Sequence, residues 1–390
     1  MKALLLEAEW SPRPGYEPSE RERREQRAEN ANQVYRNPRL RLAERPVPRP
    51  GPGELLVQVR ACGVCGSDLH MIEREPDGYM SSADPARLPV ALGHEFSGVV
   101  SEVGPGVDAF RPGDAVCVEA SQWCGACPPC RAGIFGQCAN LNEHGFSLDG
   151  GFAEYVLTKP QYCWSLEPLR RAYEGDDAAV FELGALVEPY SVIYNAVFVR
   201  AGGFLPGGHV AVFGAGPIGL ATIQFARFAG AGTIIAFDTV AERRALALQV
   251  GAEAALDPVQ LAKDGQDPVA LVQELTDGAG VALAVEAAGA GRHTFPVLER
   301  LLALGGKVIQ VGVGAGQTPV TLITLQTHNV NLYGAMGSSG SGVFPAVIRL
   351  FAAKRLAARE VITARFPLEQ VLAAFDRTAE RRDGKVLVVA

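Results

Sequence analysis

The sequence lacks an excess of basic residues. Across its 390 residues, 36 Lys and Arg stand against 43 Asp and Glu, for a formal net charge of −7. Because nucleic-acid-binding proteins usually carry a basic stripe, this balance argues against a nucleic-acid partner. Hydrophobic residues at 48% and charged residues at 20% exclude a disordered chain and predict a sizeable core. At about 150 residues per domain, the length predicts two to three domains.

The sequence also lacks a long uninterrupted apolar run. The uncharged stretch 210–226 contains three glycines and a proline, and the longer stretch 308–348 is broken by glycines and polar residues. A bilayer span needs about 20 predominantly apolar residues, so we expect no membrane partner. The first acid, Glu7, comes too early for a signal peptide, and we expect a cytoplasmic protein.

Cysteine is missing from the second half of the chain. The eight cysteines are Cys62, Cys65, Cys117, Cys124, Cys127, Cys130, Cys138 and Cys163. An even number can mean disulfides, but this chain is large and we expect it to stay in the cytoplasm. The clustering therefore favours metal binding.

Four of the cysteines form one compact motif, C-x2-C-x2-C-x7-C, from Cys124 through Cys127 and Cys130 to Cys138. Four thiolates with no open position are typical of structural zinc. An iron–sulfur cluster also accepts four thiolates, but its common bacterial spacing is absent here, and free or oxidised thiols are a further alternative. We interpret this loop, residues 123–139, as a structural zinc site.

A second group of metal-binding residue types is spread along the chain. Cys65 follows Cys62 in a C-x-x-C pair, and His94 and Glu95 follow about thirty residues later, within Gly93-His-Glu95. Taken separately, these motifs could be a redox pair and a core histidine. Together they offer a thiolate, an imidazole and a carboxylate, which suits a catalytic zinc with an exchangeable position. Glu188 lies in an apolar run, where a cation would offset the cost of a buried carboxylate.

The rhythm of the chain changes between its two halves. From about residue 55 to 157, short apolar runs alternate with turns, which predicts a mostly antiparallel β-rich domain. From 210 to about 314, apolar strands alternate with helical patterns, which predicts a parallel sheet covered on both faces. A helix near 344–353 and a last strand at 385–389 are expected to return the chain to the first domain.

The segment 9–45 is unlike the rest, with nine Arg and seven Glu. No apolar stripe runs through its most charged part, 20–29, so we expect a solvated helix or loop there. A lid or a subunit contact is the alternative.

A dinucleotide-binding fingerprint follows the strand 210–213. The motif G-x-G-x-x-G comprises Gly214, Gly216 and Gly219, with Pro217 and Ile218 between the last two, and it opens a helical pattern. Strand before, helix after and an acid near the end of the next strand are the context that supports this interpretation. The pyrophosphate is then expected on the helix N-terminus.

Asp238 closes that next strand, 19 residues after Gly219. Its carboxylate can accept hydrogen bonds from the adenosine ribose and would repel a 2′-phosphate, so we predict NAD rather than NADP. Arg243, five residues later, leaves NADP open as an alternative. We also expect Val311, Gly312 and Val313, at the end of a later strand, to contact the cofactor.

In order and combination, these motifs resemble the zinc-dependent medium-chain dehydrogenases, the alcohol, polyol and threonine dehydrogenase superfamily. The resemblance rests on Cys65–His70, Gly93–Glu95, the four-cysteine loop, Gly151–Tyr155, Glu188-Pro189 and the nucleotide fingerprint. It implies an α/β fold with three parts. They are a GroES-like catalytic domain over 1–192 with the charged insertion near 10–40, a Rossmann domain over 193–333, and a return to the catalytic domain over 334–390.

The resemblance also implies site residues and activity. Cys65, His94, Glu95 and Glu188 match the catalytic zinc ligands, with the direct role of Glu95 against Glu188 left open. Ser67 and His70 match a proton relay to solvent. Residues such as Trp123, Asn140–Phe146 and Gly340–Pro345 resemble a cyclitol-oxidising branch.

The expected reaction is therefore hydride transfer from a secondary alcohol of a cyclitol or polyol, such as an inosose or inositol, to NAD, with two zinc ions per chain. Alternatives are a sorbitol-type, threonine or simple alcohol dehydrogenase and, more remotely, a non-catalytic NAD-binding scaffold. A homodimer or homotetramer is implied. Cys62, Cys117 and Cys163 are expected to be small buried hydrophobes.

Overall fold

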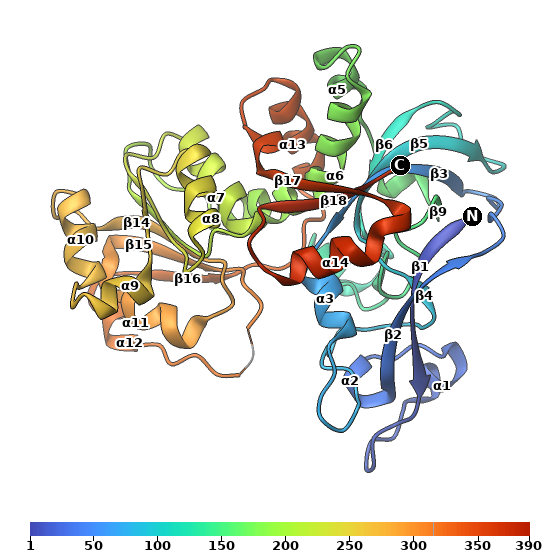
Figure 1. The fold of residues 1–390 in the computed structure, drawn as a ribbon, viewed down its shortest axis with the longest axis horizontal. Helices are drawn as coiled ribbons and strands as arrows, with labels where there is room; N and C mark the ends of the chain where they lie inside the picture. The colour runs from blue at the N-terminus through green and yellow to red at the C-terminus, as the bar shows by residue number, and fades with distance from the viewer. Residues whose placement is uncertain (315) are drawn as a thin grey trace.

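The computed structural model describes residues 1–314 and 316–390 and shows two sheet-based regions joined by helices (Figure 1). The β-rich region contains both ends of the chain, and the α/β region lies between them in sequence. The helices are α1 (Glu20–Glu25), α2 (Ala31–Val34), α3 (Gly66–Ile72), α4 (Pro128–Arg131), α5 (Glu167–Ala172), α6 (Asp177–Tyr194), α7 (Pro217–Phe228), α8 (Ala241–Gln249), α9 (Pro258–Lys263), α10 (Pro268–Leu275), α11 (Gly291–Leu301), α12 (Leu322–Thr327), α13 (Val343–Ala352) and α14 (Val371–Ala379). Among the described residues, no helix combines the length and apolar character needed to cross a membrane.

The β-rich region is mostly antiparallel, as expected. Its main sheet has seven strands in the order β10-β6-β5-β3-β18-β17, with β9 also paired to β3. These strands are β3 (Leu55–Val64), β5 (Glu95–Val103), β6 (Ala115–Val118), β9 (Tyr155–Thr158), β10 (Cys163–Ser165), β17 (Ile362–Pro367) and β18 (Lys385–Val389). Two smaller sheets contain β1 (Lys2–Trp10), β2 (Tyr35–Glu44) and β4 (Val90–Ala91), and β7 (Ser121–Gln122) with β8 (Asn142–Glu143).

The α/β region is a six-stranded, entirely parallel sheet. The strand order is β13-β12-β11-β14-β15-β16. Its strands are β11 (Val210–Phe213), β12 (Ile234–Phe237), β13 (Ala254–Leu256), β14 (Val281–Glu286), β15 (Leu302–Gln310) and β16 (Asn331–Gly334). Every residue of β11 and β12 is buried, because helices cover both faces of the sheet, and this explains why those strands are continuously apolar. The doubly wound parallel sheet predicted from the alternating pattern is confirmed.

The last strand returns to the β-rich region, as predicted. β18 pairs antiparallel with β3, Val386 opposite Val64, and parallel with β17. α6 runs through residues 192 and 193, where one domain boundary is expected, and a π-helix continues it to Arg200. The division into domains therefore stays a prediction, with that boundary inside a helix.

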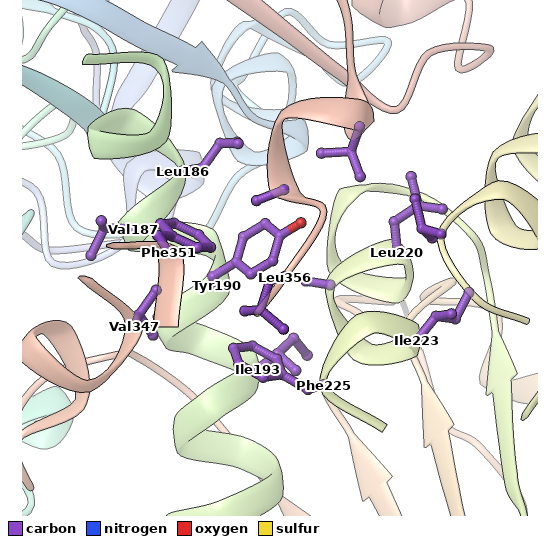
Figure 2. Close-up of a cluster of buried hydrophobic side chains, with 14 of the residues drawn as sticks. Leu186, Val187, Tyr190, Ile193, Leu220, Ile223, Phe225, Val347, Phe351 and Leu356 are labelled. Atoms are coloured by element: carbon purple, nitrogen blue, oxygen red, sulfur yellow. The ribbon is translucent and has the colours of Figure 1, made fainter. Parts of the chain in front are cut away.

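One apolar core joins the two regions. Side chains from α6, α7 and α13 meet in it, with Tyr190 and Phe225 5.8 Å apart between ring centroids and Tyr190 and Phe351 5.0 Å apart (Figure 2). Separate cores lie inside the β-rich region and on the other face of the parallel sheet. Because this shared core is closely packed, it fixes the position of the metal-binding motifs in the β-rich region relative to the nucleotide fingerprint in the α/β region.

The charged segment is only partly solvated. α1 exposes most of its charges, but Glu22 is buried and closes a capping box with Ser19. The residues after it, Ala28, Ala31 and Val34, are fully buried against the β-rich core. The expectation of a solvated helix or loop over 20–29 holds for α1 except at Glu22 and is wrong at Ala28, because Ala28 is the first of three apolar residues, spaced three apart, that anchor the segment.

Candidate active site and second metal centre

The four-cysteine loop closes into one cluster. The sulfur atoms of Cys124, Cys127, Cys130 and Cys138 all lie within 4.8 Å of one another. The Cys127 and Cys138 sulfurs are 3.8 Å apart. Tetrahedral zinc with Zn–S bonds of about 2.3 Å places its sulfurs about 3.8 Å apart, so this spacing fits the ion. None of the eight cysteines forms a disulfide in the described chain.

Backbone N–H groups stabilise two of these sulfurs, those of Cys124 and Cys138. The N–H of Cys127 donates to Cys124 Sγ at 3.4 Å, and the N–H groups of Cys124 and Asn140 donate to Cys138 Sγ at 3.3 Å each. Donation from the N–H groups of Ala126 and Cys127 lowers the pKa of Cys124 to about 6. Stabilised thiolates are what zinc requires, so the residues present fit a structural zinc ion.

The second site is assembled from two segments that are distant in the sequence. Cys65 precedes α3, while His94 and Glu95 stand at the start of β5, and their ligand atoms lie within 4.8 Å of one another. His94 and Glu95 are 6% and 1% exposed. One thiolate, one imidazole and one carboxylate leave a fourth position for substrate, which fits a catalytic zinc ion.

Asp68 is a residue that the motif reasoning did not single out. Its Oδ1 lies 3.4 Å from His94 Nδ1, and its Oδ2 accepts the Cys65 N–H at 2.9 Å. Burial lowers the pKa of His94, but the adjacent Asp68 carboxylate and Cys65 together outweigh burial and raise that pKa well above its ordinary value. An acid that holds the second nitrogen of a metal-binding histidine fixes the ring's orientation. Its place three residues after Cys65 was the available signal.

Lys385 is a second residue that the sequence did not mark. It opens β18, is 1% exposed, and pairs with Glu95 inside the protein. Burial lowers the pKa of Lys385, while Glu95, with smaller contributions from Cys65 and Asp68, outweighs burial and raises that pKa. A buried lysine at the start of an apolar strand carries no motif, so only the pairing of β18 with β3, which in turn pairs with β5, reveals this contact.

Among the described residues, Glu188 is not part of the group whose ligand atoms all lie within 4.8 Å of one another. Its Oε1 accepts the Ser338 hydroxyl at 3.2 Å. Burial raises the pKa of Glu188 to about 7, and Glu95 adds to the rise. The geometry thus favours Glu95 over Glu188 as the direct carboxylate ligand, and the ligand roles themselves remain predictions.

The two expected relay residues lie on α3 but make different contacts. Ser67 Oγ lies 3.2 Å from His94 Nε2, beside the metal-binding group. The His70 side chain is 38% exposed and contacts Glu73 through Nδ1 at 3.0 Å. One residue of the pair therefore faces the site and the other faces solvent.

The nucleotide fingerprint has the expected local geometry. Gly214 has φ of +93°, and a Cβ on Gly219 would come within 1.8 Å of the Gly214 carbonyl oxygen. A Cβ on Gly216 would meet only the end of Arg243, no closer than 3.6 Å. Protein packing thus demands the outer two glycines, while the middle one leaves backbone open to a ligand. Pro217 and Ile218 begin α7 directly behind it.

The other expected cofactor residues lie at the same carboxyl edge of the sheet. Asp238 follows β12, and its carboxylate accepts the N–H groups of Ala215 at 2.7 Å and Val240 at 2.8 Å. Arg243 Nε donates to the Asp383 carbonyl at 3.2 Å, and burial lowers the pKa of Arg243. After β15, the N–H groups of Val311 and Gly312 donate to the Glu286 carbonyl, and Val313 is 84% exposed.

The remaining cysteines behave as expected. Cys62, Cys117 and Cys163 are 0%, 1% and 6% exposed, and burial raises the pKa of each thiol.

Comparison with known proteins gives matches along most of the chain. Residues 51–168 match the alcohol dehydrogenase GroES-like domain, and residues 217–353 match the zinc-binding dehydrogenase family. The sequence is 40% identical over 363 residues to scyllo-inosose 3-dehydrogenase from Thermotoga maritima, covering 90% of each chain. It is 31% identical over 360 residues to sorbitol dehydrogenase from Gallus gallus, covering 91% of this chain and 94% of that one. A solved structure from Thermotoga maritima described as an alcohol dehydrogenase superposes with a TM-score of 0.93 at 37% identity, covering 100% of both chains.

Proposed function

The chain belongs to the zinc-binding alcohol dehydrogenase family, and we propose that it oxidises a secondary hydroxyl of a cyclic polyol, of the inosose and inositol class, to a ketone with NAD⁺. Family membership makes it an oxidoreductase with a GroES-like region and a Rossmann region. It also confirms zinc and a nicotinamide dinucleotide as the cofactors expected from the resemblance. The substrate, the residue roles and the choice of NAD over NADP are the proposed parts.

One observation supports the cyclitol substrate more than any other. The identity with the scyllo-inosose enzyme, 40%, exceeds the 31% shared with the sorbitol enzyme over nearly the same length. The substrate named for the more similar relative is a polyhydroxylated ring, whereas sorbitol is an open chain. A sorbitol-type, threonine or simple alcohol substrate is the alternative.

The chain's own residues would do the following. Cys65, His94 and Glu95 would hold the catalytic metal, and Asp68 would keep His94 and the Cys65 backbone in place. Bound zinc supplies Lewis acidity toward the substrate hydroxyl, and NAD⁺ supplies the hydride acceptor. The carbinol carbon loses a hydride and the hydroxyl loses a proton, so the remaining task of the protein is to remove that proton.

Ser67 and His70 offer a way out for the proton. Ser67 lies beside His94, and His70 stands one helical turn later with its ring partly in solvent. Because positioned proton transfer is worth about 10²–10⁴-fold, we expect His70→Gln to lower kcat by about 100-fold near neutral pH. Glu73→Gln, which alters only the residue that His70 contacts, serves as the control. A His70→Gln enzyme with the rate and pH profile of the wild type would contradict the relay.

NAD is preferred over NADP on electrostatic grounds. Asp238 holds two backbone N–H groups at the ribose end of the fingerprint, and its charge would repel a 2′-phosphate. Arg243 is half-buried and engaged with the Asp383 carbonyl. We expect kcat/KM for NAD to exceed that for NADP at least tenfold, and a tenfold preference for NADP would reject this assignment.

A substrate panel tests the proposal directly. Initial rates with NAD are measured for myo-inositol, scyllo-inosose, sorbitol, L-threonine and cyclohexanol. The proposal predicts the highest kcat/KM on a cyclitol, by at least tenfold. A higher value on sorbitol or threonine would move the enzyme to that substrate class, and no turnover with any alcohol would favour a non-catalytic NAD-binding protein.

A further inference from the structure

A carboxylate outside the metal-binding motifs lies next to the candidate active site. Glu143 ends the short strand β8, opposite Ser121 of β7, and Ser121 Oγ donates to its Oε1 at 3.4 Å. Its carbonyl accepts the N–H groups of Ser147 at 2.9 Å and Leu148 at 3.0 Å, and its own N–H donates to Ser147 Oγ at 2.9 Å. The tight turn fixes the backbone, so the direction of the side chain is determined locally.

The segment after Glu143 packs against His94 and against its chain neighbours Gly93 and Phe96. The rings of Phe146 and His94 are 5.3 Å apart between centroids, and those of His144 and Phe96 are 5.4 Å apart. Between them, a Cβ on Gly145 would come within 3.0 Å of the Gly93 backbone nitrogen. Such close backbone approach is possible only with glycine, and it fixes the distance between β8 and the start of β5.

The Glu143 carboxylate interacts electrostatically with His94 and with Glu188. Burial raises the pKa of Glu143, while the charge of His94 opposes that rise. Glu143 in turn contributes to the raised pKa of Glu188. The Glu143 side chain is only half-buried and, among the described residues, forms no ion pair. A half-buried carboxylate without a cation still needs hydrogen-bond donors, which a ligand can provide.

The charged N-terminal segment contacts the loop that contains Glu143. Arg27 Nη2 donates to the Leu141 carbonyl, two residues before Glu143, and Arg27 is buried enough to lower its pKa. Ala28 forms a β-bridge with Ala86, and the N–H of Arg87 donates to the Phe146 carbonyl at 3.1 Å. The segment that the sequence left without a role thus supports both ends of the Glu143 turn.

We propose that Glu143 determines substrate specificity by accepting a hydrogen bond from a substrate hydroxyl other than the one that is oxidised. The assignment rests on the proposed alcohol-oxidising function of the adjacent site. A polyol has such additional donors, whereas a monohydric alcohol presents its only hydroxyl to the metal. An ionised carboxylate can only accept hydrogen bonds, so it favours a substrate that presents a hydroxyl donor. A substrate that presents an apolar ring edge leaves the carboxylate without a hydrogen-bond partner.

The test compares two six-membered rings that differ in hydroxyl number. The holoenzyme and its Glu143→Gln and Glu143→Leu variants are assayed with NAD on myo-inositol and on cyclohexanol. Because a hydrogen bond to a charged group is worth roughly 10- to 100-fold, we expect the ratio of kcat/KM for myo-inositol to that for cyclohexanol to fall by that factor, mainly through KM. Glu102→Gln, an exposed carboxylate near the far end of β5, should keep the wild-type ratio.

The outcomes separate this inference from the proposed function. Equal losses on both rings would mean that Glu143 serves only the metal site or the fold, and an unchanged ratio would remove it from substrate binding; either result overturns the proposal. Zinc content by mass spectrometry should stay at two per chain in each variant.

If the wild type uses sorbitol instead of cyclitols, the cyclitol assignment fails, and the same ratio of kcat/KM values is then measured for sorbitol against 2-butanol. A wild type that favours no polyol over its monohydric counterpart also overturns the role of Glu143.

Discussion

The two metal-binding groups of this protein are built in opposite ways. The four-cysteine loop takes all its ligands from fifteen consecutive residues, carries four identical donors, and leaves Cys124 exposed at the surface. The other group combines three different donors from two distant segments, and its carboxylate and histidine are almost completely buried. The first is supported mainly by nearby backbone N–H groups, the second by the charged side chains of Asp68 and Lys385.

This contrast explains what each group can do. Backbone N–H groups of the cysteine loop donate hydrogen bonds to its thiolates, so the bound ion is the only further component that the site requires. Four thiolate ligands leave no coordination position for a substrate. The buried group has three ligands, and its neighbours adjust charge and orientation around an exchangeable position. We therefore expect changes in the first to appear in stability and changes in the second to appear in turnover.

The largest effect is expected at Cys65. Replacing it in Cys65→Ser removes the thiolate ligand, and because Lewis-acid activation is worth several kcal/mol, kcat/KM should fall by at least about 10³-fold. The variant should remain folded, bind NADH with wild-type affinity in a fluorescence titration, and hold one zinc per chain instead of two. Retained turnover at more than a tenth of the wild-type rate would break the distinction between the two groups.

Next is the four-cysteine loop. Cys127→Ser should cost about 4 kcal/mol of folding free energy, a fall in Tm of roughly 10 °C by thermal denaturation, because structural zinc stabilises the fold directly. Cys117→Ala is the matched control, since Cys117 is buried and outside both groups. The control should keep two zinc ions, whereas a Cys127→Ser protein with unchanged Tm and two zinc ions would refute a structural role.

A smaller effect is expected at the residue that orients the buried group. Asp68→Asn keeps the shape of the side chain but removes the charge next to His94, and such outer partners are worth about 10–100-fold in activity or metal affinity. Activity after dialysis against a weak chelator, with zinc content measured in parallel, gives the result. Loss of Tm with unchanged activity would make Asp68 a structural residue only.

The smallest effect is expected at the corresponding neighbour of the cysteine loop. Asn140 Nδ2 donates to Cys124 Sγ at 3.6 Å, a long contact, while its backbone N–H supports Cys138. Asn140→Ala keeps the backbone donor, so we expect at most about 1 kcal/mol of destabilisation and unchanged kcat. A drop in kcat with unchanged Tm would show that the loop communicates with the reaction.

The sequence predicted well wherever a motif is local. The C-x2-C-x2-C-x7-C spacing and the G-x-G-x-x-G turn each depend on residues close in the chain, and the structure brings both together as expected. It predicted less where the partners are distant. Lys385 reaches Glu95 only because β18 joins β3 at the end of the chain, and the loop that contains Glu143 packs against His94 through Phe146.

The charged segment shows the same limit. Its composition predicts solvation, which holds for α1, but Ala28, Ala31 and Val34 are buried against a surface that exists only after folding. Small apolar side chains scattered among charged and polar residues give only a weak hydrophobic periodicity, so the sequence does not indicate which face of the segment is buried.

The sequence by itself determined the family, the parallel and antiparallel sheets, the four-cysteine centre and the nucleotide turn, because each is encoded by short-range spacing and hydrophobic rhythm. Only the tertiary structure decided which carboxylate stands with Cys65 and His94, which charges orient them, and which further acid lies beside them. Apart from Asp68, which follows Cys65 by three residues, those relations depend on strand pairing and packing between residues tens to hundreds of positions apart, which spacing along the chain does not reveal.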